Sequence, residues 1–458
     1  MTKGKMIIFF LCALLCSATS VGAYSKIHTT AVDWFKSSHP YPVWSRYEQS
    51  AVYTIPNEYD PALNIRTSAE LPKVRLTGNI VDMSKYSNRP MQFKYDYKES
   101  HLSGYAAVSL QGNSSLNYRK KSFSIKLFTD RTHDVEYKPS FGNWYNTENY
   151  ILKANWIDYT GARNIVASRL YKKMPNAMLP NGTYGIPDGF PVKLYINNSY
   201  RGLYTIVQPK KKKLFGLKDK DAVNGARLYS AEKKDGSAVF ENSSALDDNW
   251  ECKFPADHFD KTALNRLTEF VSSCTYEEFK TYASHYMDIN SLINYIVFSE
   301  ITMNADGWQK NYNIVTYDGK LWYIRPYDLD CTFGLDFAGN ISESAYTDPM
   351  KDWINTTRLW TLTKACFPQE IYQRYLEVRH GALTEDAVMN EFKEFIDKVG
   401  TETYMNENTI WNRRGNIYDS FAQIKDYIKT RYAYLDEYMP AEFDHPSYFP
   451  SYKTKTVD

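Results

Sequence analysis

The N-terminal half of the chain alternates between apolar and polar residues over short runs, the pattern of half-buried β-strands. In the clearest run, 120–128, Phe123, Ile125 and Leu127 share one face while serines and lysines occupy the other. Turn-forming residues separate this run from others of similar length. Strands are predicted at 74–77, 91–95, 105–110, 120–128, 150–154, 191–196, 201–207 and 226–230.

The C-terminal half changes to the period of amphipathic helices. In the longest predicted helix, 417–439, Ile424 and Tyr432 share one side, and Pro440 is predicted to end the helix. The segment 289–301 is apolar throughout most of its length, as in a buried helix. Other helices are predicted at 160–174, from 261 onward, and at 276–286, 358–365, 369–380 and 384–399. The pattern predicts a two-lobed α+β fold with a β-rich N-terminal half and a helical C-terminal half.

Acidic residues cluster where the two halves meet, in the stretch 300–334. Asp306 is followed five residues later by Asn311, and a short hairpin is predicted next. After its apolar second strand the chain reaches Asp328 and Asp330. Two carboxylates one residue apart repel each other unless a proton or a cation relieves them, and a hard metal ion with oxygen ligands would do so.

An Asp and an Asn five residues apart, with an acidic pair some twenty residues later, is the spacing of a protein-kinase active site. In such a site the first Asp orients the hydroxyl that accepts the phosphoryl group. The Asn and the later Asp hold magnesium ions on the phosphates. The alternative is a solvated charge cluster at the end of a strand.

A candidate phosphate-binding segment lies earlier in the chain. The polar loop 112–115 precedes the strand that carries Lys120 and Lys126. Backbone amides and ammonium groups both bind phosphate oxygens. The alternative is an ordinary half-exposed strand whose lysines face water. Arg163 falls in the first turn of a predicted helix, where it opposes the helix dipole, so it is predicted to have an acidic partner or a role in the site.

Charge and the N-terminus limit the class of protein. The net charge is +2, which gives no general electrostatic case for binding nucleic acid. Lys3 and Lys5 precede an apolar run and then small residues up to Ala23, the pattern of a cleaved secretory signal peptide. No later stretch is long and apolar enough to cross a bilayer. A secreted or cell-surface protein is therefore predicted.

Four cysteines follow the predicted signal peptide. Cys252 and Cys274 flank a helical segment and are the favoured disulfide, although four cysteines allow three sets of pairings. Cys331 lies beside the acidic pair, where a free thiol is an equally good interpretation. None of the cysteines has the spacing of zinc ligands. The sequence leaves the oligomeric state open.

Several motifs, in this order along 71–439, resemble those of the spore-coat protein H (CotH) kinase family, a group of atypical protein kinases. They comprise the polar loop with the lysine strand, an Asn-Trp-Ile-Asp segment with an Arg-Asn pair, a strand pair with Arg-Gly-Leu-Tyr, and the two acidic segments. Their positions are 111–115 with 120–123, 155–158 with 163–164, 195–197 with 201–204, 304–311, and 326–334. Two residues depart from the family pattern: Gln111 replaces an Arg and Gln208 replaces a Glu.

The resemblance implies a two-lobed atypical protein-kinase-like fold and ATP-dependent phosphoryl transfer to Ser or Thr of a secreted or surface protein. Asp306 would position and deprotonate the acceptor, while Asp328, Asp330 and Asn311 would bind Mg²⁺, with Mn²⁺ as the alternative. The residues expected at the ATP phosphates are Gly112, Asn113, Ser114, Ser115, Lys120 or Lys126, and Arg163.

The organisation that follows is a signal peptide, an N-terminal extension, a kinase domain in two lobes and a C-terminal tail. Their expected bounds are 1–23, 24–70, 71–440 (N-lobe 71–249, C-lobe 250–440) and 441–458. The sequence leaves open whether its expected destination is a spore coat or a cell surface.

Two other functions are compatible with the same residues. A surface adhesion or structural protein with little or no catalysis is favoured by the predicted secretion and by Gln111 and Gln208. Transfer of an adenylyl group from ATP is the other hypothesis, because the same metal and phosphate site can expose another phosphorus atom of ATP. Metal-dependent nucleotide binding would separate a kinase from an adhesion protein, and product mass would separate the two transfers.

Overall fold

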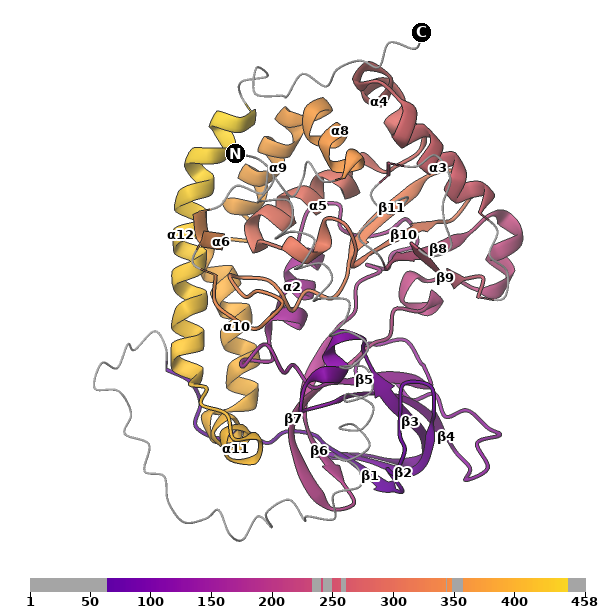
Figure 1. The fold of residues 1–458 in the computed structure, drawn as a ribbon, viewed down its shortest axis with the longest axis vertical. Coiled ribbons are helices and arrows are strands. Elements are labelled where there is room, and N and C mark those ends of the chain that lie inside the picture. Colours follow the sequence, from indigo (N-terminus) through magenta and orange to yellow (C-terminus); the bar gives the residue numbers. More distant parts are fainter. Residues whose placement is uncertain are drawn as a thin grey trace, which may run out of the picture.

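The computed structural model describes residues 64–232, 240–241, 249–256, 261–342, 344–347 and 357–443. A β-barrel lies at one end, and a larger part made of helices and a small sheet lies at the other (Figure 1). The predicted signal peptide, residues 24–63 of the predicted extension and residues 444–458 of the predicted tail lie outside the described residues. No helix within the described ranges has the length and apolar character needed to span a bilayer.

Seven strands close into the barrel in the order β1-β2-β3-β4-β5-β7-β6. Neighbours are antiparallel except β1 and β6, which close the barrel in parallel. Because side chains alternate along each strand, Phe93, Ile125, Leu152 and Val192 join one packed interior core. The strands are β1 (Lys73–Gly78), β2 (Arg89–Tyr97), β3 (Ser100–Gln111), β4 (Ser122–Phe128), β5 (Asn149–Lys153), β6 (Gly189–Ile196) and β7 (Ser199–Val207).

The second part combines a four-stranded antiparallel sheet, in the order β11-β10-β8-β9, with the helices that pack around it (Figure 1). Its strands are β8 (Arg227–Ala231), β9 (Trp250–Phe254), β10 (Tyr312–Thr316) and β11 (Trp322–Pro326). Helix α5 (Ile289–Thr302) is buried along most of its length, as its apolar sequence predicts. The other α-helices of the described ranges are α2 (Arg163–Lys172), α3 (Thr262–Ser273), α4 (Tyr276–Tyr282), α6 (Ser344–Thr347), α8 (Arg358–Cys366), α9 (Pro368–Arg379), α10 (Glu385–Val399), α11 (Thr401–Trp411) and α12 (Ile417–Phe443).

The predicted division into a β-rich and a helical half is confirmed, and each predicted strand overlaps an observed one. The kinase-like fold stays a prediction. Helix α11 was not predicted, because its sequence lacks an apolar stripe. Helix α12 continues to Phe443, so the predicted stop at Pro440 is wrong. Pro440 lies in the last turn, where the loss of one N–H donor does not end the helix.

The predicted disulfide between Cys252 and Cys274 is also wrong, because the structure has both as free thiols, together with Cys331 and Cys366. The thiol of Cys252, in β9, donates to the carbonyl of Pro255 at 3.2 Å. Cys274 follows α3 and is buried. The two thiols are therefore held by different elements, which their spacing in the sequence does not show.

A buried ion pair joins the barrel to α11. The Nζ atom of Lys120 lies 2.7 Å from Oε2 of Glu407, and both side chains are almost fully buried. Lys120 also donates to the carbonyl of Leu203, and Glu407 accepts the N–H of the same residue. Gly202 is required beside them, because a Cβ there would lie 1.9 Å from Oε1 of Glu407. The pair fixes the start of β4 and the strand β7 against α11.

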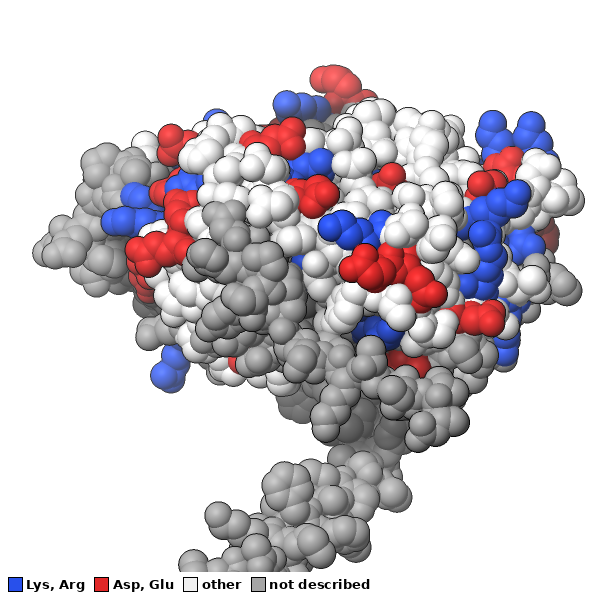
Figure 2. Space-filling model, turned by 90° about the horizontal axis from the view of Figure 1, so that it is seen from above, with Lys and Arg blue, Asp and Glu red and all other residues white. Residues whose placement is uncertain are grey.

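Acidic and basic side chains are interspersed over most of the described surface seen in Figure 2, with basic side chains gathered toward one edge. This distribution agrees with the small net charge of +2. Proteins that bind nucleic acid usually present a broad basic stripe or patch. The described part of this face carries mixed charge instead.

Candidate active site

The hairpin of β10 and β11 brings Asn311 and Asp328 together. Asn311 precedes β10 and Asp328 follows β11, and the N–H of Tyr327 donates to the carbonyl of Asn311 at 2.9 Å. Both residues have left-handed backbone conformations, with φ of 58° for Asn311 and 57° for Asp328. Residues other than glycine rarely adopt this conformation, and they gather at functional sites.

Asp306 reaches Asn311 from the short 3₁₀ helix η8 (Ala305–Gly307), which follows α5. Its Oδ2 atom accepts a hydrogen bond from Nδ2 of Asn311 at 2.6 Å and lies 3.0 Å from Nζ of Lys310. The five-residue spacing therefore places the two side chains in direct contact. The side-chain oxygen of Asn311 accepts no hydrogen bond from the described residues and is available to a cation.

Lys153, the last residue of β5, reaches across from the barrel to the hairpin. Its Nζ atom lies 2.6 Å from Oδ1 of Asp328, and the side chains are 13% and 33% exposed. Burial alone would lower the pKa of Lys153, but the charges of Asp328 and Asp330 outweigh it and raise that pKa. Burial likewise opposes ionisation of Asp328, but Lys153, Lys210 and Lys310 hold its pKa below the usual value. Both partners are therefore charged at neutral pH.

Asp330 carries the least compensated charge in the site. Burial, followed by the charge of Asp328, raises the pKa of its carboxyl group to about 7, although Lys153 opposes the shift. Among the described residues its one hydrogen-bonding contact is the thiol of Cys331, at 3.7 Å. A carboxylate in these surroundings is stabilised by a bound cation.

These donors fit a hard divalent cation. The carboxylates of Asp328 and Asp330 and the amide oxygen of Asn311 are the kind of oxygen ligands that Mg²⁺ and Mn²⁺ take. The described residues contain no group of three or more His, Cys, Asp or Glu side chains that could hold a metal ion. Phosphate oxygens or water would therefore complete the coordination, as is usual for a magnesium ion bound with a nucleotide.

The start of α2 holds the acidic loop 328–333 in place. The side-chain oxygen of Asn164 accepts the backbone N–H of Leu329 at 3.1 Å. The Nε atom of Arg163 donates to the carbonyl of Thr332 at 3.1 Å. Two consecutive helix residues thus fix both ends of the loop that carries the candidate metal ligands.

Arg163 has the acidic partner that its place in the first helical turn predicted. One guanidinium nitrogen lies 2.6 Å from Oδ1 of Asp158, and both side chains are only 2% exposed. Another donates to the side chain of Gln423 at 2.5 Å. These contacts keep the guanidinium group inside the protein, so the structure favours a positioning role for Arg163 over contact with a phosphate.

The polar loop 112–115 leads to the acidic site from the barrel. It continues through the 3₁₀ helix η3 (Ser114–Asn117) to Tyr118, whose hydroxyl donates to the carbonyl of Phe337 at 3.3 Å. Burial first, and then nearby negative charge that includes Asp330, raises the pKa of Tyr118. The side chain of Tyr118, just past this loop, therefore lies near the segment that follows the acidic residues.

The two lysines predicted to bind phosphate have other partners. Lys120 is buried in its pair with Glu407, and Lys126 pairs with Glu136 at 2.8 Å on the barrel surface, where both side chains are more than one third exposed. Among the described residues, neither lysine has a hydrogen bond or ion pair with Asp306, Asp328 or Asp330. Their placement gives no support to a role at the phosphates.

Three lysines that the sequence interpretation missed, Lys153, Lys210 and Lys310, do lie in the site. The Nζ atom of Lys210 donates to Ser230 at 2.9 Å and to Glu232 at 2.5 Å, and it lies 4.5 Å from the ring centre of Tyr327. Lys210 begins a run of four lysines, a pattern typical of a solvated loop. For Lys153 the available signal was a charged residue at the end of an otherwise apolar strand.

The structure thus defines a mixed α+β protein in which a barrel and a helical part meet at a cluster of acidic and lysine side chains. The chain belongs to the CotH kinase protein family, because the model of that family matches residues 108–435. This confirms the resemblance inferred from the motifs. All the acidic and lysine residues of the site lie in the matched interval. A comparison with curated proteins found no significant match.

Proposed function

We propose that this protein transfers the γ-phosphoryl group of ATP to a Ser or Thr hydroxyl of a secreted or surface protein. The observation that carries the proposal is the convergence of Asp306, Asn311, Asp328 and Lys153 where the barrel meets the helical part. Membership of a family described as kinases supports this class of reaction.

In the proposed reaction, Asp328, Asp330 and Asn311 hold Mg²⁺ or Mn²⁺, which would neutralise charge on the phosphates. Lys153 lies close enough to Asp328 to contact a phosphate held by the same metal site. Lys210 adds a second positive charge near Asp328. This division of charge suits a reaction in which catalysis depends mainly on positioning and charge neutralisation.

Asp306 is the proposed base. It is in direct contact with Asn311, so a hydroxyl bound beside Asp306 would lie close to a phosphate on the metal site. As the hydroxyl oxygen forms its bond to the γ-phosphorus, the bond from that phosphorus to the ADP oxygen breaks and Asp306 takes the hydroxyl proton.

Metal-dependent ATP binding tests the site. Calorimetry on the mature protein is expected to show ATP binding with Mg²⁺ that is lost in EDTA and weakened at least about tenfold by Asp330→Asn. Asp336→Asn is the control, because Asp336 lies six residues further on and bonds the backbone of its own turn. No ATP binding in the presence of the metal would contradict the proposal and favour an adhesion or structural role.

A further inference from the structure

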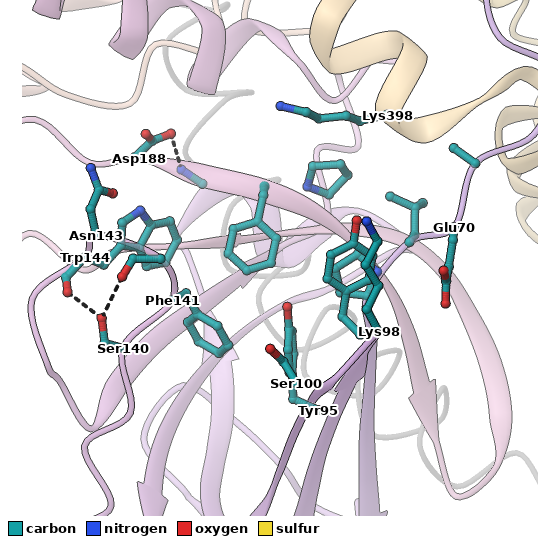
Figure 3. Close-up of a pocket in the computed structure, with 18 of the residues that line it drawn as sticks. Glu70, Tyr95, Lys98, Ser100, Ser140, Phe141, Asn143, Trp144, Asp188 and Lys398 are labelled. Atoms are coloured by element: carbon teal, nitrogen blue, oxygen red, sulfur yellow. Dashed lines mark hydrogen bonds between the residues drawn. The ribbon is translucent and has the colours of Figure 1, made fainter.

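A cavity of about 690 Å³ opens on the barrel, and none of its lining residues belongs to the acidic site. It lies between the β2–β3 hairpin, the loop 140–144 and the start of β6, with residues of segment 66–72 and of α10 at its border (Figure 3). Its volume is in the range of sites that bind small molecules.

Aromatic rings form the wall of this cavity. The ring centre of Phe141 lies 4.8 Å from Tyr95, 6.0 Å from Trp144 and 5.5 Å from Phe190. Trp144 and Phe190 are 5.3 Å apart and only partly buried. Accessible ring faces are electron-rich and attract polarised C–H groups of a ligand.

Small polar side chains border the rings. Ser100, Ser140 and Asn143 are exposed and lie around the aromatic wall in Figure 3. The hydroxyl of Ser140 donates to the carbonyl of Trp144 at 2.6 Å, which leaves its oxygen as an acceptor. The cavity thus offers hydroxyl and amide groups beside apolar ring faces.

Charge around the cavity is largely balanced. Arg169 pairs with Asp188 at 3.0 Å, and Lys398 pairs with Glu394 at 2.5 Å. The lining groups left without an ion pair among the described residues are Arg66, Glu70 and Lys98. Their excess of one positive charge lies on exposed side chains, where solvent and salt screen it, so it gives little basis for selecting a strongly ionic ligand.

The edge of β6 that faces the cavity is poorly suited to an added peptide strand. By the alternation along the strand, residues 189, 191 and 193 point their backbone groups to the side of β6 on which the segment before β1 lies, and the N–H of Lys193 donates to Pro72 there at 2.8 Å. Pro191 has no N–H, and the N–H and carbonyl of Gly189 are both bonded to side chains. A peptide that added here as a strand would find no free backbone donor.

We propose that this cavity binds a neutral oligosaccharide built of pyranose rings. The C–H faces of such rings would stack on Trp144 and Phe190, and their hydroxyls would bond to Ser100, Ser140 and Asn143. The ligand carries no charge, in keeping with the balanced border. This site is separate from the acidic site and does not depend on the proposed phosphoryl transfer.

The test is calorimetric titration of the mature protein with neutral hexasaccharides of different linkage, including cellohexaose, xylohexaose and maltohexaose. The wild type is expected to bind at least one of them, and Trp144→Ala is expected to weaken that binding about tenfold or more. Tyr86→Ala is the matched control, because Tyr86 is 91% exposed and does not line the cavity. Thermal unfolding of each variant checks that it is folded.

Binding to none of the saccharides at millimolar concentration would overturn the proposal, and so would unchanged binding by a folded Trp144→Ala variant. Asn143→Ala, at an exposed position, provides the second test if the tryptophan variant does not fold, with a several-fold loss of affinity expected. A cavity that binds a proline-rich peptide and no saccharide would overturn the proposal in favour of a peptide ligand.

Discussion

Lys153 and Asp328 form an ion pair of 2.6 Å although 175 residues separate them in the sequence. One residue ends a strand of the barrel and the other follows a strand of the second sheet. The pair therefore ties the two parts of the protein together at the candidate metal site. Its partial burial makes it more than an ordinary surface contact, because solvent screens it less.

Replacing Lys153 tests this relationship. Lys153→Met is expected to lower phosphoryl transfer on the order of a hundredfold or more, because it removes a positive charge from the phosphates. Lys126→Met is the control, since Lys126 forms an exposed pair on the barrel, worth about 0–1 kcal/mol. Initial rates of peptide phosphorylation measure both variants. Equal losses in the two would count against a specific role for Lys153.

The raised pKa of Asp330 leads to a prediction of how the stability of the metal-free protein depends on pH. The pKa of its carboxyl group is raised from 3.8 to about 7. Between these values the folded protein holds a proton that the unfolded chain has released, so the free energy of unfolding falls as pH rises through this window. Asp330→Asn is expected to remove this fall and to stabilise the metal-free protein above pH 7 by at most about 4 kcal/mol.

Urea unfolding in EDTA at several pH values between 3.8 and 7 measures this effect. A pH dependence that is the same in wild type and Asp330→Asn would show that another group titrates. Mg²⁺ added above this window is expected to stabilise the wild type and to have less effect on the variant, because the ionised carboxylate is the proposed ligand.

Arg163 is expected to act through the position of the acidic loop. Arg163→Lys keeps a positive charge beside Asp158 but loses the planar set of donors that also reaches Thr332. The rate of phosphoryl transfer should fall about tenfold or more. The loss in the free energy of unfolding should be smaller than the free energy that corresponds to this fall in rate. Arg169→Lys is the matched control on the same helix, where the arginine is partly exposed. Normal turnover and normal Mg²⁺ affinity in Arg163→Lys would contradict the positioning role.

Variants of Lys120 distinguish a structural role of this lysine from a role in binding the phosphates. Lys120→Met leaves Glu407 buried without its cation and is expected to cost about 3–5 kcal/mol of stability. Adding Glu407→Gln should recover part of this loss, because the amide can still accept the N–H of Leu203. A folded double variant should then transfer phosphate at close to the wild-type rate. Loss of ATP binding in that folded double variant would indicate that Lys120 does contact the phosphates.

Local patterns in the sequence predicted the elements that local contacts determine. Alternation along 120–128 predicted a strand whose residues Phe123, Ile125 and Leu127 are buried in the barrel. The five-residue spacing of Asp306 and Asn311 predicted a functional pair, and the two side chains are in contact because one short turn separates them. From its place in the helix alone, Arg163 was predicted to have an acidic partner or a role in the site, and it pairs with Asp158.

Contacts between distant residues were beyond these patterns. Closure of the barrel depends on the parallel pairing of β1 with β6, in which Leu76 lies opposite Ile196. The partner of Lys120 is 287 residues away, so its alternating strand looked the same as one with a solvated lysine. Lys153 was overlooked for the same reason, because its importance comes from Asp328 and not from its neighbours in the chain.

The central claim is tested most directly by intact mass spectrometry of the mature protein and a peptide containing Ser and Thr, after incubation with ATP and Mg²⁺ or Mn²⁺. The account predicts that the wild type adds the mass of a phosphate to the peptide and that Asp328→Asn, which keeps the size of the side chain, does not. Addition of an adenylyl mass to the peptide would indicate that the same site transfers an adenylyl group and not a phosphoryl group. Equal phosphate addition by Asp328→Asn, or no added mass with the wild type, would contradict the account.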